Sequence, residues 1–116
     1  MKKNIAIVGG SSDIAIATVN HISKEKYNFF ALIREQDKSS ELSDLGVDVT
    51  IGDATSEDDI KNFISGVKES GEIHAILHCV GSFAVRPPHA MNKEAFEAVI
   101  STNLTSAFLT LSIAGK

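Results

Sequence analysis

A short apolar run that ends in two glycines, near the start of the chain, constrains the fold more than any other stretch. Residues Ile5 to Val8 are apolar and mostly β-branched, which predicts a strand buried on both faces. Two glycines follow, and then three side chains that can accept hydrogen bonds from the first N–H groups of a helix: Gly9, Gly10, Ser11, Ser12 and Asp13. A strand, a glycine turn and a helix N-terminus together surround a phosphate with backbone N–H groups. The stretch therefore predicts a phosphate or dinucleotide site. An ordinary strand-to-helix turn is the alternative, because neither G-x-G-x-x-G nor a P-loop ending is present.

Composition narrows the class of protein. The chain has 116 residues, of which 43% are hydrophobic, and this predicts one globular domain over residues 1–116. A formal net charge of −4 argues against nucleic acid and anionic membrane surfaces as partners. The single cysteine, Cys79, excludes an internal disulfide and favours a reducing, cytoplasmic location. No apolar run has the length of a signal peptide or of a membrane span, so we expect no membrane partner.

Strands and helices are predicted to alternate along the whole chain. Apolar runs predict strands at 5–8, 27–33, 47–51 and 73–80. Helical spacing predicts helices at 14–22, at 39–45, between Ser56 and Gly71, and from about residue 92 onward. This alternation is typical of βαβ units. We therefore expect an α/β fold: a Rossmann-type doubly wound parallel sheet of about four strands, in the order 3-2-1-4, with helices on both faces.

The glycine turn resembles the cofactor motif of the short-chain dehydrogenase/reductase family. That motif, Thr-Gly-x-x-x-Gly-x-Gly, aligns with the stretch Val8 to Ala15, in which Gly9 is kept and Asp13 replaces the second glycine. The resemblance covers essentially all 116 residues and implies an oxidoreductase that uses NAD(P) to transfer hydride to or from a carbonyl or alcohol. It implies that the cofactor is bound by Gly9, Ser11, Ser12, Asp13 and Ile14. The Asp13 carboxylate would repel a pyrophosphate unless it caps the helix or turns away.

The end of the second predicted strand is where the family selects its cofactor. Arg34 stands there, and the resemblance implies that it accepts the 2′-phosphate of NADP. An acidic residue would instead bind the ribose 2′-hydroxyl of NAD, and Glu35 follows directly, so NAD is the alternative cofactor. Without the glycine turn before it, Arg34 would be interpreted as a solvated charge at the end of a strand.

Two further strand ends carry residues that the resemblance assigns to the cofactor. Asp53 and Ala54, after the third strand, match the family's pair that contacts the adenine. An aspartate that bonds the local backbone of a turn is the alternative. Residues 78–81 occupy the place of the family's Asn-Asn-Ala-Gly motif, in which the glycine alone matches and lets the backbone approach the ribose closely. The resemblance therefore implies cofactor contacts at Cys79, Val80 and Gly81.

The last predicted helix carries a polar residue, Asn103, within a broad apolar face. That face is formed by Phe96, Val99, Ile100, Leu104, Ala107, Phe108 and Leu111. A buried amide needs hydrogen-bonding partners. The segment Thr102 to Thr105 resembles the family segment in which an asparagine bonds main-chain groups and helps to hold a water of the catalytic proton relay. The resemblance thus implies a catalytic role for Asn103, with a polar residue at a helix–helix contact as the alternative.

The family's other catalytic residues do not occur in these 116 residues. The family's chemistry needs a serine near the end of a fifth strand and a Tyr-x-x-x-Lys pair, but the single tyrosine, Tyr27, is followed four positions later by Ala31. His74, His78 and His89 lack the remaining ligands of a zinc site, so we expect no metal. We therefore expect the truncated, NADP(H)-binding portion of a reductase. The alternative is a non-catalytic nucleotide-binding or assembly module.

An exposed strand edge leads to a prediction about partners besides the dinucleotide. Strand 73–80 would lie at the edge of the sheet as an apolar strand with unpaired backbone groups, an arrangement that proteins avoid. The apolar face of the last helix would also lack part of its cover. We therefore expect a homo-oligomer that forms through strand 73–80 or through helix 92–114.

Overall fold

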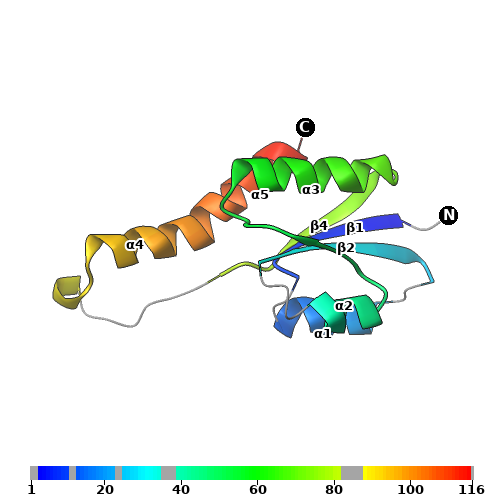
Figure 1. Ribbon diagram of the computed structural model, residues 1–116, viewed down its shortest axis with the longest axis horizontal. Coiled ribbons are helices and arrows are strands. Elements are labelled where there is room, and N and C mark those ends of the chain that lie inside the picture. Colours follow the sequence, from blue (N-terminus) through cyan, green and yellow to red (C-terminus); the bar gives the residue numbers. More distant parts are fainter. Residues whose placement is uncertain (1–2, 11–12, 23–24, 35–38, 82–87, 116) are drawn as a thin grey trace.

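The computed structural model describes residues 3–10, 13–22, 25–34, 39–81 and 88–115 (Figure 1). Its strands are β1 (Lys3–Val8), β2 (Tyr27–Ile33), β3 (Asp48–Ile51) and β4 (Ile73–His78). Its helices are α1 (Asp13–His21), α2 (Ser39–Asp44), α3 (Glu57–Glu69), α4 (Lys93–Ile100) and α5 (Ser106–Ala114). A short 3-10 turn, Pro88–Ala90, precedes α4, and a π-helical turn, Ser101–Thr105, joins α4 to α5. The bounds of the predicted elements agree with these to within two residues, except at the π-helical turn.

The four strands form one parallel sheet in the order β3-β2-β1-β4, which confirms the predicted topology. β1 is central, and its Ile7 lies opposite Ala31 of β2 and Leu77 of β4. Ala6, Ile7 and Val8 are completely buried, as expected for a strand that is covered on both faces. β4 forms one edge of the sheet in the described part of the chain.

Helices cover both faces of the sheet (Figure 1). On one face, α1 and α2 pack against the sheet through three buried residues: Ala15, Val19 and Leu42. On the other face, α3 contributes Ile60, Phe63, Ile64 and Val67. Three residues of α5, Leu109, Ile113 and Ala114, pack against that second core. This confirms the doubly wound arrangement, and it leaves the loops at the strand ends to position a site.

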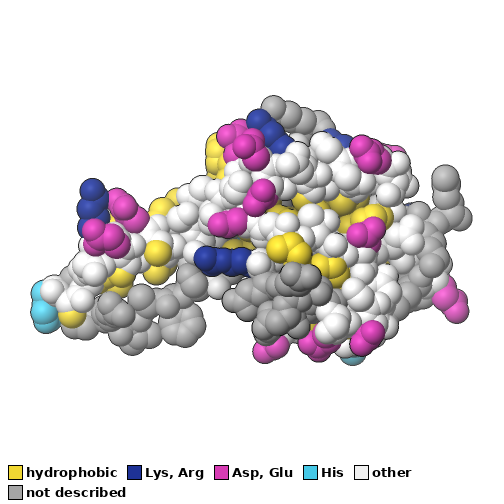
Figure 2. All heavy atoms as spheres, in the orientation of Figure 1, with side chains coloured by type: hydrophobic (Ala, Val, Ile, Leu, Met, Phe, Trp, Pro, Cys, Tyr) yellow, Lys and Arg dark blue, Asp and Glu magenta, His cyan; other side chains and the backbone are white. Residues whose placement is uncertain are grey.

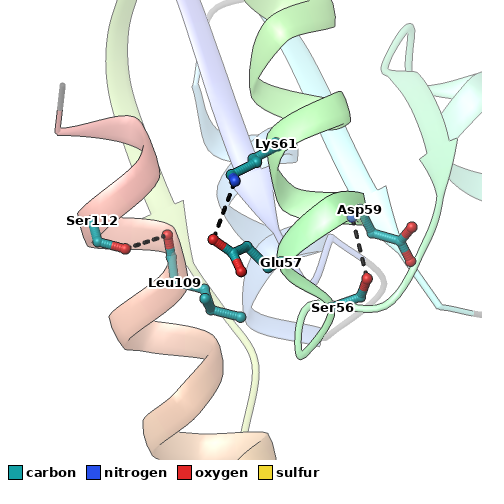
Figure 3. Close-up of polar contacts among 6 residues, drawn as sticks. All are labelled: Ser56, Glu57, Asp59, Lys61, Leu109 and Ser112. Atoms are coloured by element: carbon teal, nitrogen blue, oxygen red, sulfur yellow. Dashed lines mark hydrogen bonds and ion pairs between the residues drawn. The ribbon is translucent and has the colours of Figure 1, made fainter.

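A side-chain cap fixes the start of α3 beside the end of β3 (Figure 3). Ser56 Oγ accepts a hydrogen bond from the N–H of Asp59 at 3.2 Å. These two residues form only half of a capping box, because the Asp59 carboxylate accepts from the N–H of Asp53 at 2.8 Å. The nearby ion pair, Lys61 Nζ to Glu57 Oε1 at 3.2 Å, is exposed and adds little stability. The bonds of Ser56 and Asp59 therefore fix the start of α3 to the turn that follows β3.

One long helix, Lys93–Ala114, extends beyond the sheet (Figure 1). Asn92 caps its start by accepting a hydrogen bond from the N–H of Ala95 at 2.7 Å. α4 projects away from the three-layer body, and the molecule measures 54 Å along its longest axis against 29 and 20 Å along the others. α5 returns to the body and packs against α3.

The apolar face of this helix is more exposed than the sequence pattern predicts. Its large side chains in contact with solvent are Phe96, Ile100, Leu104, Phe108 and Leu111. With 22 residues, the helix is long and apolar enough to cross a membrane, by length and composition alone. This corrects the expectation that no stretch has that length. The length and composition of one such helix are weak evidence for a membrane span, since the core helix of a soluble protein can have the same length and composition.

Candidate functional site

The carboxyl ends of four parallel strands meet at one edge of the sheet. β1 ends at Val8, β2 at Ile33, β3 at Ile51 and β4 at His78. Each predicted cofactor residue in the described part of the chain follows one of these ends directly or begins the next helix. In doubly wound folds, ligands bind outside this edge, where the strand order reverses. Here the order reverses between β1 and β4, beside the glycine turn.

The glycine turn after β1 is pressed between the neighbouring strands. Gly9 has φ +85°, and a Cβ at this position would lie 2.7 Å from Val80 Cγ2. A Cβ on Gly10 would lie 2.5 Å from the Cβ of Ala31. The N–H groups of both glycines donate to the carbonyl oxygen of Leu32, at 2.9 and 3.2 Å. Both positions therefore require glycine, and their N–H groups are used to hold the turn against β2.

α1 begins at this turn with two exposed side chains. Asp13 is its first residue, and its carboxylate is favourably placed next to the positive end of the helix dipole. Ile14 is 74% exposed, which is unusual for an apolar residue at a helix start. Ser11 and Ser12, which the resemblance also assigns to the cofactor, lie outside the described residues.

Arg34 and Asp53 are close enough for their charges to interact. The pKa of the Asp53 carboxyl is lowered mainly by the hydrogen bonds that its Oδ1 accepts from Thr55, from the N–H at 2.8 Å and from the hydroxyl at 2.7 Å. The positive charge of Arg34, which is exposed after β2, lowers this pKa by a smaller amount. Partial burial opposes them. Asp53 therefore has the local turn bonding that the alternative interpretation predicts, and Ala54 beside it is half-buried.

The end of β4 brings Cys79, Val80 and Gly81 to the glycine turn and to the long helix. Cys79 N–H donates to the carbonyl oxygen of Val8 at 2.8 Å, which extends the pairing of β4 with β1. A Cβ on Gly81 would lie 3.2 Å from Asn103 Oδ1, so the Asn103 amide lies over this glycine. Its Nδ2 donates to the carbonyl oxygen of Val99 at 2.9 Å. Asn103 is half-buried, and its side chain bonds back to α4 from its place in the π-helical turn.

A histidine–serine pair that the sequence did not predict joins β4 to α5. His78 Nε2 lies 2.9 Å from Ser106 Oγ, whose hydroxyl donates to the carbonyl oxygen of Thr102 at 2.5 Å. Since the serine proton is used in that bond, His78 Nε2 must carry the proton that it shares with Ser106. Burial lowers the pKa of His78. The two residues are 28 positions apart, so only the topology could have revealed the pair.

A family model described as short chain dehydrogenase matches residues 3–115. The chain belongs to this family. Nicotinamide dinucleotides are the cofactors of the short-chain dehydrogenases, and the strand order and glycine turn found here are those of a cofactor-binding fold. Among the described residues, no three His, Cys, Asp or Glu side chains gather in a way that could hold a metal ion.

Solved structures of family members share this fold. A short-chain type dehydrogenase/reductase from Mycobacterium ulcerans is 20% identical, with a TM-score of 0.88 over 97% of this chain and 45% of that chain. An actinorhodin polyketide ketoreductase variant with NADPH is 21% identical, with a TM-score of 0.88 over 99% of this chain and 47% of that chain. A citronellol catabolism dehydrogenase from Pseudomonas aeruginosa is 23% identical, with a TM-score of 0.83 over 97% and 48%.

The chain thus spans just under half the length of these three family structures. This agrees with the expectation that the sequence represents part of a short-chain dehydrogenase. At such identities, the likeness is evidence for the fold alone, and it leaves the activity, substrate and cofactor preference of this chain to be inferred from its own residues.

Proposed function

We propose that this chain is the NADP(H)-binding portion, over residues 1–116, of a short-chain dehydrogenase that transfers hydride to or from a carbonyl or alcohol. The observation that carries the proposal is the position of Arg34. Its exposed guanidinium follows β2 at the edge where the glycine turn lies. A guanidinium donates charge-assisted hydrogen bonds to a 2′-phosphate, whereas an NAD site places an acidic residue here.

The other predicted residues support a binding path along the same edge. We assign the pyrophosphate to the turn at Gly9, Ser11 and Ser12 and to the start of α1, where Asp13 and Ile14 lie. Asp53 and Ala54 would hold the adenine, and Cys79, Val80 and Gly81 the ribose. Glycine is required at this turn by its packing against β2 and β4. Because the N–H groups of Gly9 and Gly10 bond the carbonyl oxygen of Leu32, the N–H groups at the start of the helix would be the ones that meet the pyrophosphate. When bound, the cofactor supplies or accepts the hydride.

We propose a catalytic role for Asn103 within a longer polypeptide. Its amide lies over Gly81 and is held by the carbonyl oxygen of Val99 in α4, so a water bound there would lie beside the proposed nicotinamide end of the site. The serine and the Tyr-x-x-x-Lys pair do not occur in these 116 residues. We therefore expect this chain alone to bind cofactor without turnover.

Titration with reduced cofactor tests the proposal. NADPH fluorescence should change saturably with the chain, and NADH should bind at least about 10-fold more weakly, since it lacks the phosphate that Arg34 would bind. Arg34→Ala should remove most of this preference by weakening NADPH binding about 10- to 100-fold, with little effect on NADH. Lys26→Ala, which removes an exposed cation next to β2, is the matched control and should change neither affinity. Equal affinities for both cofactors would contradict the assignment of Arg34.

A non-catalytic nucleotide-binding or assembly module is the second candidate. The exposed carboxylate of Asp13 at the start of α1 favours it, because this charge opposes a pyrophosphate. Asp13→Asn separates the two candidates. If Asp13 only weakens a working site, then the variant should bind NADPH about 3- to 10-fold more tightly than the wild-type chain. If neither protein binds NADPH, the module is the better description.

Two further properties belong to the proposal. We infer that the chain works in the cytoplasm, because its one cysteine, Cys79, fits a reducing compartment. We also infer that it self-associates and does not bind nucleic acid or membranes. The edge position of β4 and the exposed apolar residues of the long helix support self-association, and the net charge of −4 disfavours polyanions.

A further inference from the structure

A histidine and a buried serine form a hydrogen-bonded path that the proposed cofactor site does not use. His78 Nε2 donates to Ser106 Oγ at 2.9 Å, and the Ser106 hydroxyl donates to the carbonyl oxygen of Thr102 at 2.5 Å. Ser106 is completely buried, with 0% of its surface exposed. Because its oxygen accepts from His78, its single hydroxyl proton is directed toward Thr102. The path therefore runs from the end of β4 into the π-helical turn, Ser101–Thr105.

The π-helical turn redirects the backbone bond that Thr102 would receive in an α-helix. There, the N–H of Ser106 would donate to the carbonyl oxygen of Thr102, four residues back. In this turn, the same N–H donates to Ser101, five residues back. The hydroxyl of Ser106 donates to Thr102 in its place. One side chain thus provides a hydrogen bond that the wider turn takes from the backbone, and this favours the turn over a regular helix.

The direction of the Asn103 amide depends on this turn. Asn103 directly follows Thr102, and its Nδ2 donates to the carbonyl oxygen of Val99 at 2.9 Å. Its Oδ1 would lie 3.2 Å from a Cβ on Gly81. A π-helical turn holds more residues than an α-helical turn, so a return to regular α-helical bonding would rotate the two sides of the turn relative to each other by about 100°. The Asn103 amide would then change direction relative to Gly81.

α4 does little to fix the turn against the body. Every residue of α4, Lys93–Ile100, is at least partly exposed. The helix projects away from the sheet (Figure 1), and hydrophobic side chains lie at its surface (Figure 2). Ser106, by contrast, is the first residue of α5 and directly follows the turn. Its bond to His78 therefore connects the turn to the sheet at the point where the helix reaches the body.

His78 is itself held within the sheet. It lies opposite Val8 of the central strand β1, and the N–H of the next residue, Cys79, donates to the carbonyl oxygen of Val8 at 2.8 Å. Gly81, the glycine under the Asn103 amide, follows three residues after His78. One strand end thus carries both the histidine that reaches the turn and the glycine over which the turn places Asn103.

We propose that His78 is a positioning residue of the site: through Ser106, it holds the π-helical turn in the geometry that places the Asn103 amide over Gly81. The inference rests on the proposed role of Asn103 and assigns the residues that hold it in place. A contact that served only the packing of β4 against α5 would contribute to stability without acting on the Asn103 amide. The two roles therefore differ in what happens to Asn103 when the contact is removed.

Nuclear magnetic resonance of the 116-residue chain separates these two roles. The side-chain amide signals of Asn103 are assigned by their loss in the variant Asn103→Ser. His78→Leu, which removes the donor, should shift these signals. It should also make the Ser106 N–H exchange with solvent at least about 10-fold faster, since the turn loses its hydrogen bond to the sheet. His78→Gln keeps an N–H donor and should restore both the signals and the slow exchange.

Two further variants distinguish this effect from a general loss of stability. Ser106→Ala removes the acceptor and should change the Asn103 signals as His78→Leu does, and the double variant should add no further change. Thr110→Val is the matched control, because the Thr110 hydroxyl is also buried and bonds the helix backbone, at the carbonyl oxygen of Ser106 2.8 Å away. It should lower stability without shifting the Asn103 signals.

A measurement on the wild-type chain completes the test without any substitution. At about pH 7.5, where histidine is mostly neutral, the imidazole nitrogen signals of His78 should place its proton on Nε2. A proton on Nδ1 would overturn the proposal. Unchanged Asn103 signals in both His78→Leu and Ser106→Ala would overturn it as well, and so would an equal change in Thr110→Val.

Addition of NADPH separates this inference from the proposed function. Saturation with NADPH should shift the Asn103 signals in the wild-type chain and in His78→Gln. If NADPH has no effect while His78→Leu still shifts these signals, His78 holds Asn103 in place and the cofactor site is contradicted. If NADPH shifts them and His78→Leu does not, the cofactor site stands and the positioning role of His78 is overturned.

Discussion

Two glycines of this chain that look alike in the sequence occupy opposite environments. Gly9 has φ +85°, and a Cβ there would lie 2.7 Å from Val80 Cγ2, whereas a Cβ on Gly66 in α3 would meet nothing within 4 Å. Gly9→Ala should therefore lower the free energy of unfolding by about 2–4 kcal/mol, from a disfavoured backbone conformation and a steric clash. Gly66→Ala should raise it by up to about 1 kcal/mol, since alanine favours a helix. Urea unfolding followed by circular dichroism measures both. A similar loss for the two variants would contradict the crowding inferred at the turn.

The same contrast shows which site residues a sequence can reveal. The positions of Gly9 and Arg34 at strand ends could be predicted, because each follows a strand whose end is marked locally, by a glycine or by the first charge after an apolar run; their roles in a cofactor site stay predictions. The pair formed by His78 and Ser106 could not, since its geometry depends on how α5 lies across β4. The coupling of Arg34 to Asp53 likewise requires two neighbouring strands, β2 and β3, whose ends are 18 positions apart in sequence.

For the helices and strands, the cap of α3 is a direct test of local structure. Ser56 Oγ satisfies the N–H of Asp59, one of the groups that the helix itself leaves without an acceptor (Figure 3). Ser56→Ala should lower the free energy of unfolding by about 1 kcal/mol. Ser112→Ala is the matched control, because its exposed hydroxyl only donates to the carbonyl oxygen of Leu109 within α5. It should change stability by no more than about 0.5 kcal/mol. Equal losses would mean that the cap contributes nothing.

The contact between His78 of β4 and Ser106 of α5 predicts that the stability of the chain depends on pH. Burial lowers the pKa of His78 from its ordinary value of 6.5. The unfolded chain therefore takes up a proton on His78 at a higher pH than the folded chain. Neutral His78 thus costs the folded state nothing above pH 6.5, and the free energy of unfolding decreases as the pH falls from there toward the lowered pKa. Chemical unfolding at about pH 7.5 and about pH 5 should show this loss in the wild type. His78→Gln should reduce it, whereas His74→Gln, at an exposed position of β4, should not.

Local patterns predicted the positions of helices and strands well, but not their finer geometry. The strand at 27–33 and the start of the helix at Asn92 follow from an apolar run and from a cap residue, both of which are local. The π-helical turn Ser101–Thr105 could not be predicted, because its residues have ordinary helical preferences and its i to i+5 bonds depend on how the helix is anchored. The exposure of the apolar face of the helix Lys93–Ala114 could not be predicted either, since the spacing of apolar residues indicates which of them share a face and not what covers that face.

For the whole molecule, the proposed cofactor would bridge residues at the ends of all four strands, so its binding should stabilise the complete sheet. A ligand that binds only the folded chain adds about 2.7 kcal/mol at 100 times its dissociation constant. For a domain of 116 residues, this corresponds to a rise in melting temperature of about 10 °C. NADPH at that excess should produce this shift, and NADH at the same concentration a clearly smaller one, because Arg34 would bind the 2′-phosphate that NADH lacks.

The variant Arg34→Ala separates cofactor recognition from general stabilisation by a nucleotide. Its own melting temperature should stay close to that of the wild type, because the side chain is exposed at the end of β2. The shift with NADPH should fall to that with NADH. If NADPH does not shift the melting temperature of either protein, the edge formed by the four strand ends does not hold the cofactor in this chain, and the non-catalytic module becomes the better account. A shift that is equal in both proteins would instead retain the site and remove Arg34 from it.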